Sequence, residues 1–459
     1  MLSVIQHWYR SRAARPYVRP WGLAMPILVL VVCLPLLRPL LHPTDISQNE
    51  RERLATIEAI VEHRTLSIDH TSFIPKDRLG PATGPEKHHY SKQPPVMAAI
   101  LAGPYWIMYH CGLTFGSNPA LACYLLTLLG CTLPVAGAAA LVYRMGRVFE
   151  LERPWRTVLA AAAIFGSGLV SYATVLNSHA PAAAMLLAGC AALYHAGTTR
   201  QADRSRGWVM FAGLVVALAA TIDMAALVFL VLLPLVVLSM RWTVSMKMQS
   251  LTWYVLGALA PLVVHAALTI PITGDIRPGF LHANYASQVI LVDDSEDAPS
   301  LMALTALKLL DGLLGPHGLL THFPVLLFGI IGLAIVLRRH WPAPTKTLAG
   351  VSVLSAILIV GVYGVLNPDW GQPMFAVRWF ILFLPLLVFW SGAWLRHKHR
   401  PAVWGIAVAV LVFSIFTSLI GAAAPFAPGK RGEYTVYSAA KWLLRGSPSA
   451  GYTMLDTNE

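Results

Sequence analysis

Long apolar stretches are the feature that most constrains this chain, because each is long enough to cross a lipid bilayer. A spanning helix needs about 20 predominantly apolar residues. Lys, Arg, Asp and Glu make up only 12% of the 459 residues, too few to cover the surface of a soluble protein. We therefore expect an all-α polytopic membrane protein with about eleven transmembrane helices. The predicted spans lie near 21–41, 119–143, 157–175, 180–197, 207–222, 224–240, 250–271, 319–337, 347–366, 376–395 and 402–421.

The distribution of charge predicts the orientation of these spans. Residues 95–113 are also apolar, but Pro104 interrupts them. If this segment lies in the membrane interface instead of spanning, every loop rich in Lys and Arg falls on one side, as the positive-inside rule requires. This predicts a cytoplasmic N-terminus (1–20), a membrane domain (21–421) and an outer C-terminal tail (422–459). The net charge of +12 then reflects orientation, and we expect the bilayer as a partner and no nucleic acid.

Two outer loops collect most of the polar residues. The first (42–118) has Leu54, Ile57, Ile60 and Val61 at helical spacing, which predicts an amphipathic helix on the membrane surface. In the same loop the sequence HHYSKQPP ends in two prolines, and proline suits the first turn of a helix, so we expect a second interfacial helix there. The second outer loop (271–318) contains an amphipathic stretch from Leu301 to Leu314.

Several sequence motifs recur in one order along the chain. The first loop contains RLATIEAIVEHRTLSID, KDRL and HHYSKQPP, and later segments read TVLNSHAPAA, LLGPHGLLTHFPVLL and DWGQPMFAVRWFILFLP. Together they resemble the motifs of bacterial GT-C glycosyltransferases related to the protein O-mannosyltransferases and the lipid A aminoarabinose transferase. The chain departs from the family pattern at Arg78, where the family has Lys, and at Ala376, where it has Gly. The lysine of the SKPP-type motif lies one position early, at Lys92.

The resemblance implies an inverting transferase that moves a sugar from a polyprenyl-phosphate donor to an envelope lipid, glycan or protein. It places the active site on the outer face of a bacterial inner membrane. The chain has no glycine-rich nucleotide-binding loop, and a lipid-linked donor does not need one. Such a reaction requires a base near the acceptor and cations for the departing phosphate.

These requirements select the candidate site residues. The candidate catalytic carboxylates are Glu50, Asp69 and Asp77, of which the last two match the family most closely. Lys92 and Arg378 are candidates for binding the donor phosphate. The candidates for the acceptor site are His88, His89, Tyr90, Asn177 and His179.

Each candidate has a structural alternative. A carboxylate in this loop can be a solvated surface charge, and Lys92 or Arg378 can be an interfacial residue whose charge reaches the headgroups. The histidines can cap or pack a helix, and we predict no metal ligands among them. Asp223, between two predicted spans, is either buried and functional or part of a tight outer turn.

Two other functions remain open. A transporter or flippase of a lipid-linked glycan would have internal repeats and ionisable groups at the middle of the membrane, and His265 is the clearest such group in this sequence. The departures from the family motifs also leave open a non-catalytic assembly subunit on the same scaffold. The sequence does not identify the sugar, the acceptor or a requirement for a divalent metal.

Overall fold

The computed structural model describes residues 21–37, 47–74, 88–198, 202–282, 301–366, 375–426 and 433–444. All the regular structure in these ranges is helical, so the predicted all-α class is confirmed. The first helices are α2 (Trp21–Cys33), α3 (Gln48–Glu58), α4 (Pro95–His110), α5 (Pro119–Thr127), α6 (Leu133–Met145) and α7 (Arg153–Phe165). The next are α8 (His179–Thr198), α9 (Ala202–Ile222), α10 (Ala226–Leu232), α11 (Pro234–Leu238) and α12 (Val244–Thr273). The last are α13 (Leu301–Leu314), α14 (Leu319–His322), α15 (Leu326–Arg338), α16 (Ala343–Leu366), α17 (Leu384–Phe389), α18 (Ser391–Leu395), α19 (Pro401–Ala423) and α20 (Thr435–Leu444).

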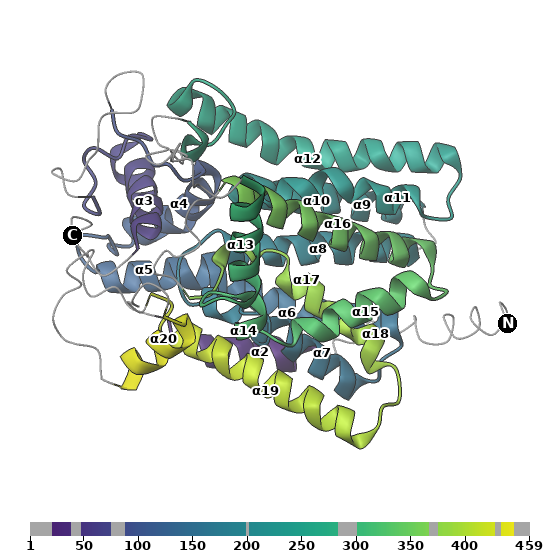
Figure 1. Cartoon of the computed structure of the whole chain (residues 1–459). Helices are drawn as coiled ribbons and strands as arrows, with labels where there is room; N and C mark the ends of the chain where they lie inside the picture. Colours follow the sequence, from purple (N-terminus) through teal and green to yellow (C-terminus); the bar gives the residue numbers. More distant parts are fainter. Residues whose placement is uncertain are drawn as a thin grey trace.

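The long helices run in roughly one direction and form a bundle (Figure 1). Within the described residues, six helices are long and apolar enough to cross a membrane, and three shorter apolar helices accompany them. A seventh span is possible if the bent pair Leu309–His322 and Leu326–Arg338, which turns through 93°, crosses as one unit. The protein is therefore an integral membrane protein. The predicted number of eleven spans stays a prediction.

Prolines explain why several predicted spans are divided into short helices. Each of the eleven predicted stretches contains helical residues, but Pro234 separates α10 from α11, and Pro324 lies at the bend before α15. Proline lacks the amide hydrogen that continues a helix, and its ring clashes with the preceding turn. Hydropathy predicts where such segments lie and does not predict where they break.

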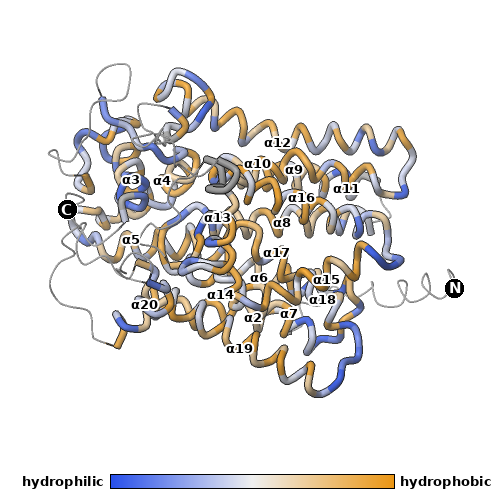
Figure 2. The backbone as a smooth tube through the Cα atoms, viewed as in Figure 1, coloured by the Kyte–Doolittle hydropathy of each residue, from blue (hydrophilic) through white to orange (hydrophobic). Residues whose placement is uncertain are grey.

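The polar residues gather at the two ends of the bundle (Figure 2). At one end lie the hydrophilic connections from α11 to α12, from α15 to α16 and from α18 to α19. At the other end lie α3, α4 and the segment that follows α12. The arrangement agrees with the predicted separation of basic loops from the polar first loop. The side on which each end lies remains a prediction.

The first loop contains both of its predicted helices. Pro95 is the first residue of α4, as the double proline indicated, and α3 packs against α4 through Leu54 and Ile57. The environment of α3 differs from the expectation of a surface helix, because its residues from Glu50 to Glu58 are all buried. Its charged side chains face polar groups of neighbouring segments instead of water. This burial brings α3 into the candidate site.

Glycines allow close packing of the spans α9 and α12. A Cβ atom placed on Gly213 would lie 2.0 Å from the carbonyl oxygen of Tyr254, and one on Gly257 would lie 2.0 Å from that of Met210. Small residues let helix backbones approach within the membrane, where lipid tails are as apolar as the side chains. The contact fixes the position of the end of α9, which Asp223 follows.

Candidate functional site

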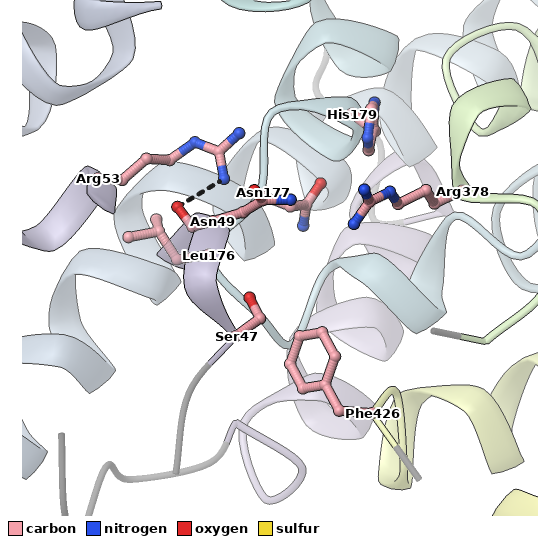
Figure 3. A pocket seen from close by; sticks show the side chains of 8 residues that line it. All are labelled: Ser47, Asn49, Arg53, Leu176, Asn177, His179, Arg378 and Phe426. Atoms are coloured by element: carbon pink, nitrogen blue, oxygen red, sulfur yellow. Dashed lines mark hydrogen bonds between the residues drawn. The ribbon is translucent and has the colours of Figure 1, made fainter. Parts of the chain in front are cut away.

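A pocket lies where the start of α3, the segment before α8 and the segment before α17 meet (Figure 3). The pocket is small and partly open to solvent. Its lining residues are Ser47, Asn49, Arg53, Leu176, Asn177, His179, Arg378 and Phe426. The pocket brings together three of the predicted site residues, Asn177, His179 and Arg378.

The first turn of α3 forms one wall of the pocket. Asn49 and Arg53 lie one turn apart and therefore on one face of the helix. Arg53 donates to the carbonyl oxygen of Asn49 at 3.2 Å, to Oε1 of Gln93 at 2.9 Å and to Oγ of Ser178 at 3.2 Å. Gln93 in turn donates to Oδ1 of Asn49 at 3.0 Å. These contacts are all to neutral oxygen atoms, and the nearby groups that stabilise the charge of the buried guanidinium include Glu50, Glu52 and Asp223.

Glu50 holds this wall in place through a capping box. Its carboxylate accepts from the backbone N–H of Ser47 at 3.1 Å and from the Ser47 hydroxyl at 3.0 Å, while its own N–H donates back to Ser47. The other carboxylate oxygen accepts from the backbone N–H of Leu176 at 3.0 Å. Burial raises the pKa of Glu50, and the bonds from Ser47 and Leu176 partly oppose this. The predicted catalytic role of Glu50 is untested, but its carboxylate oxygens are already used to join α3 to the segment before α8.

The segment before α8 is shaped by Asn177. Its side-chain amide donates to the carbonyl oxygens of Tyr172 and Val175, and its Oδ1 accepts from the N–H of Ala180 at 2.9 Å. The last bond satisfies a donor of the first turn of α8, so Asn177, which was predicted only as an acceptor-site residue, caps this helix. It also lines the pocket, so the structure allows both roles.

His179 is the first residue of α8 and pairs with Asp223, which follows α9. Its Nδ1 lies 2.6 Å from Oδ2 of Asp223, and the exposed fractions of the two side chains are 11% and 4%. The ring of His179 packs edge-on against Trp379, with 5.7 Å between the ring centroids. Asp223 is therefore buried and paired, and it lies in the short turn between α9 and α10; a functional role for it stays a prediction.

Arg378 reaches the pocket from the segment before α17. Its guanidinium carbon lies 4.5 Å from the centre of the Trp379 ring, in a cation–π contact. Figure 3 shows the guanidinium groups of Arg378 and Arg53 pointing toward Asn177 from opposite sides. Two residues earlier, Ala376 has a φ of +53°, a conformation that favours glycine. The motif that this segment resembles has glycine at this position, so Ala376 adopts a backbone conformation that glycine adopts with less strain.

The lining of the pocket is cationic. It contains two arginines, one histidine, two asparagines and a serine, and none of its eight residues is a carboxylate. Burial strengthens the attraction of these groups for an anion, because little water is present to screen their charge. These residues offer hydrogen-bond donors and positive charge to a ligand in the pocket.

Asp69 is the centre of a second polar cluster in the first loop. Its carboxylate accepts from the Ser67 hydroxyl, from the backbone N–H of His89 and from Nδ1 of both His88 and His89, the two ring contacts each being 2.6 Å. Burial opposes ionisation, but the bonds from Ser67, His89 and His88 outweigh it and lower the pKa of Asp69. None of these residues lines the pocket. Their predicted catalytic and acceptor roles remain untested.

Lys92 and Tyr90 lie apart from the pocket lining. Lys92 donates its backbone N–H to Glu52 at 3.1 Å, and Tyr90 is partly buried in the same segment. Neither Lys92 nor Tyr90 is among the lining residues, whereas Arg53 of the first loop is; the predicted phosphate-binding role of Lys92 remains untested. Asp77 lies outside the described residues.

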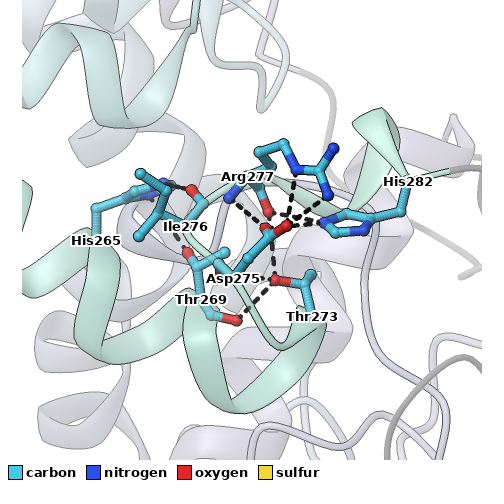
Figure 4. A network of polar contacts seen from close by, with 7 residues as sticks. All are labelled: His265, Thr269, Thr273, Asp275, Ile276, Arg277 and His282. Atoms are coloured by element: carbon cyan, nitrogen blue, oxygen red, sulfur yellow. Dashed lines mark hydrogen bonds and ion pairs between the residues drawn. The ribbon is translucent and has the colours of Figure 1, made fainter.

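A polar network orders the segment that follows α12 (Figure 4). Asp275 accepts from the backbone N–H of Arg277 at 2.7 Å, pairs with its guanidinium at 2.6 Å and lies 3.2 Å from Nε2 of His282. His265, the candidate mid-membrane group, lies 3.0 Å from the carbonyl oxygen of Ile276. The polar groups of this network therefore contact one another, within the end of α12 and the segment that follows it. Gly279, in the same segment, packs against the backbone of Lys92.

Three residues important to the pocket were not selected from the sequence. Asn49 and Arg53 resemble ordinary polar residues of a helix rich in charged side chains. Arg53 does begin one of the family-like motifs, and this is a usable signal of its importance. Phe426 has no sequence signal of this kind. In the described part of the chain, no group of three or more His, Cys, Asp or Glu residues is arranged to hold a metal ion.

Comparisons with known proteins place the fold. No protein-family model and no curated protein matches the sequence. The oligosaccharyltransferase of Archaeoglobus fulgidus in its apo form matches with a TM-score of 0.55 at 13% identity, over 94% of this chain and 59% of that chain. ArnT from Cupriavidus metallidurans in the apo state matches with a TM-score of 0.52 at 15% identity, over 85% of this chain and 62% of that chain. ArnT bound to undecaprenyl phosphate matches with a TM-score of 0.52 at 13% identity, over 94% and 73% of the two chains.

The extent of these matches limits what they establish. The chain spans about three fifths of the length of the first two structures. At 13–15% identity the similarity concerns the fold and carries no activity or substrate with it. The chain has the GT-C fold that the oligosaccharyltransferase and ArnT share.

Proposed function

We propose that the protein is a glycosyltransferase that transfers a sugar from a polyprenyl-phosphate donor to a lipid, glycan or protein acceptor. The observation that carries this proposal is the pocket in which Arg53 and Arg378 converge and in which none of the eight lining residues is a carboxylate. Such a pocket suits the phosphate of a lipid-linked sugar. We further propose that it faces the outer side of a bacterial inner membrane, with the N-terminus in the cytoplasm.

The two arginines suit the chemistry of the departing group. As the bond between the sugar and the phosphate breaks, negative charge grows on the phosphate oxygens. A guanidinium can bind two of these oxygens at once through its planar fork. Because Arg53 and Arg378 are already oriented by Gln93, Ser178 and Trp379, little reorganisation accompanies the reaction.

The structures with the same fold support the class of donor. One of them is ArnT of Cupriavidus metallidurans bound to undecaprenyl phosphate. Another is the oligosaccharyltransferase AglB of Archaeoglobus fulgidus in complex with an inhibitory peptide and a dolichol-phosphate. Both ligands include a polyprenyl-type chain with a phosphate. The proposal extends this ligand class to the present chain on the strength of its own cationic pocket.

Binding of undecaprenyl phosphate to the purified protein tests the proposal. Arg53→Gln and Arg378→Gln should each weaken binding about 10-fold or more, since each removes a charge-assisted contact with the phosphate. Arg206→Gln is the matched control, because this arginine is partly exposed on α9 and donates to Gln249. Undecaprenol, which lacks the phosphate, should compete weakly. Wild-type affinity in both pocket variants, or equal competition by undecaprenol, would contradict the proposal.

A second candidate is a lipid-phosphate-binding subunit without transferase activity. The observation that favours it is the same absence of a carboxylate from the eight lining residues, since the motif resemblance implies a carboxylate base. The two candidates differ in one measurement. The assay measures release of polyprenyl phosphate from donors carrying a labelled hexose, pentose or N-acetylhexosamine, with envelope extract as acceptor. Release supports the enzyme, and binding without release supports the subunit.

A further inference from the structure

His179 lines the pocket, and its ring is held from behind by Asp223, which is not among the lining residues. Oδ2 of Asp223 lies 2.6 Å from Nδ1 of His179, and its Oδ1 accepts from the N–H of Ala225 at 3.2 Å. The Asp223 backbone N–H also continues α9 by donating to Ala219 at 2.8 Å. The carboxylate is therefore held by the end of one span while it orients a side chain at the start of another.

The contact determines which nitrogen of His179 is available. An ionised carboxylate only accepts hydrogen bonds, so Nδ1 of His179 carries the hydrogen. In the neutral ring the lone pair is then on Nε2, and no residue in the described ranges hydrogen-bonds to that atom. Since His179 lines the pocket, Nε2 is the ring nitrogen that a bound acceptor can reach.

We propose that His179 is the general base of the transfer and that Asp223 is its positioning residue; this inference rests on the proposed function. Nε2 of His179 removes the proton from an acceptor hydroxyl as that oxygen attacks the anomeric carbon of the sugar. The bond between this carbon and the phosphate oxygen breaks, and its electron pair leaves with the polyprenyl phosphate. The products are the glycosylated acceptor, polyprenyl phosphate and a proton on His179, which passes to water.

The surroundings of His179 suit this role. Asp223 stabilises the positive imidazolium that forms, as the aspartate does in a hydrolase triad. The charged or titratable groups around it are Asp223 beyond α9, Arg378 before α17, Arg53 on α3 and Tyr363 on α16, whose ring stacks on Trp379. The phosphate bound between the two arginines offsets their charge when the imidazolium forms. Among the described groups, Glu50 and Asp69 lie outside the pocket lining and already accept several hydrogen bonds.

Four variants test the assignment. His179→Gln removes the base and keeps the size and polarity of the side chain, and His179→Ala leaves room for added imidazole. Asp223→Asn removes the positioning charge. His195→Gln is the matched control, because this histidine lies near the opposite end of the same helix α8. Each variant is assayed for release of polyprenyl phosphate from the panel of labelled donors, as a function of pH, and for binding of undecaprenyl phosphate.

The expected results separate a base from a structural residue. His179→Gln and His179→Ala should lose about 10²–10⁴-fold in turnover, the usual contribution of a general base, while still binding undecaprenyl phosphate. The wild-type loss of turnover at acidic pH should vanish in His179→Gln, and imidazole should restore activity to His179→Ala. Asp223→Asn should lose about 10-fold or more and retain binding. Retained binding of undecaprenyl phosphate by the His179 and Asp223 variants shows that the pocket is folded.

Two outcomes would overturn the inference, and they differ. If His179→Gln has near-wild-type turnover and still loses turnover at acidic pH, the base lies elsewhere. The glycosyltransferase proposal would then still stand. Failure of the wild-type protein to bind undecaprenyl phosphate or to release it from any donor would overturn the proposed function and the base assignment together. His195→Gln should match the wild type in each measurement.

Discussion

Replacement of Glu50 tests whether this buried carboxylate holds the site together or performs its chemistry. Glu50→Ala removes the bonds from the Ser47 N–H and hydroxyl and from the Leu176 N–H. Leu176 is 2% exposed, so its N–H would be left without a partner, at a cost of about 1–3 kcal/mol. The lost half of the capping box adds about 1 kcal/mol. We therefore expect Glu50→Ala to lower the free energy of unfolding by about 2–4 kcal/mol.

Glu50→Gln should have a smaller effect, because the amide keeps one acceptor oxygen for either Leu176 or Ser47. We expect a loss of about 1 kcal/mol and turnover close to that of the wild type. The assay is thermal unfolding of the purified protein in detergent, followed by the fluorescence of its 14 tryptophans, together with transfer of the labelled sugar. Glu152→Ala is the control, since Glu152 also begins a helix but is exposed and makes no side-chain cap.

Two results would refute this reasoning. An unchanged unfolding midpoint in Glu50→Ala would mean that the contacts around Leu176 contribute little. A Glu50→Gln protein of wild-type stability that lost about 10²–10⁴-fold in turnover would instead identify Glu50 as the base.

The other predictions concern topology, pH and the phosphate site. A reporter that is active only outside the cytoplasm should work when fused after residue 425 and fail when fused near Arg204; the reverse pattern would mean that residues 95–113 span the membrane. Burial raises the pKa of Glu58 to about 7, against hydrogen bonds from Ser72, so the folded protein holds this proton more tightly than the unfolded chain. Stability should therefore fall as pH rises from about 4.5 to 7, by on the order of 2 kcal/mol, and Glu58→Gln should abolish this dependence in thermal unfolding. Arg378→Lys should lower turnover about 10-fold or more at saturating donor without changing the unfolding midpoint, because an ammonium cannot replace a bidentate fork; wild-type turnover would leave only an anchoring role.

The sequence predicted the fold class because hydropathy directly reports which segments avoid water. It predicted the start of α4 at Pro95 and of α8 near His179, because proline and asparagine act locally on helix starts. It did not predict how the spans divide. The break at Pro234 and the bend at Pro324 depend on how neighbouring helices replace the lost backbone bonds, and this information is not local.

The candidate site was predicted in part for the same reason. Asn177, His179 and Arg378 belong to motifs whose residues lie close together in the sequence. Arg53 was missed as a site residue because its burial depends on Gln93 and Ser178, which lie 40 and 125 positions away. The motif that begins at Arg53 was a usable signal for its importance, but it does not predict contacts with segments so distant.

The contacts between the walls of the pocket suggest why its charged groups can act together. Glu50 joins α3 to Leu176, Arg53 joins α3 to Ser178, and Tyr172 donates to the carbonyl oxygen of Phe375 in the segment that leads to Arg378. Each of these buried hydrogen bonds connects one wall to the next, so the cations and the histidine share one frame. A transferase must hold an acceptor oxygen, an anomeric carbon and a departing phosphate in line. A frame of this kind fixes their relative positions before the substrates bind, and misplacing one wall by about 1 Å would lower the rate without removing any group that takes part in the chemistry.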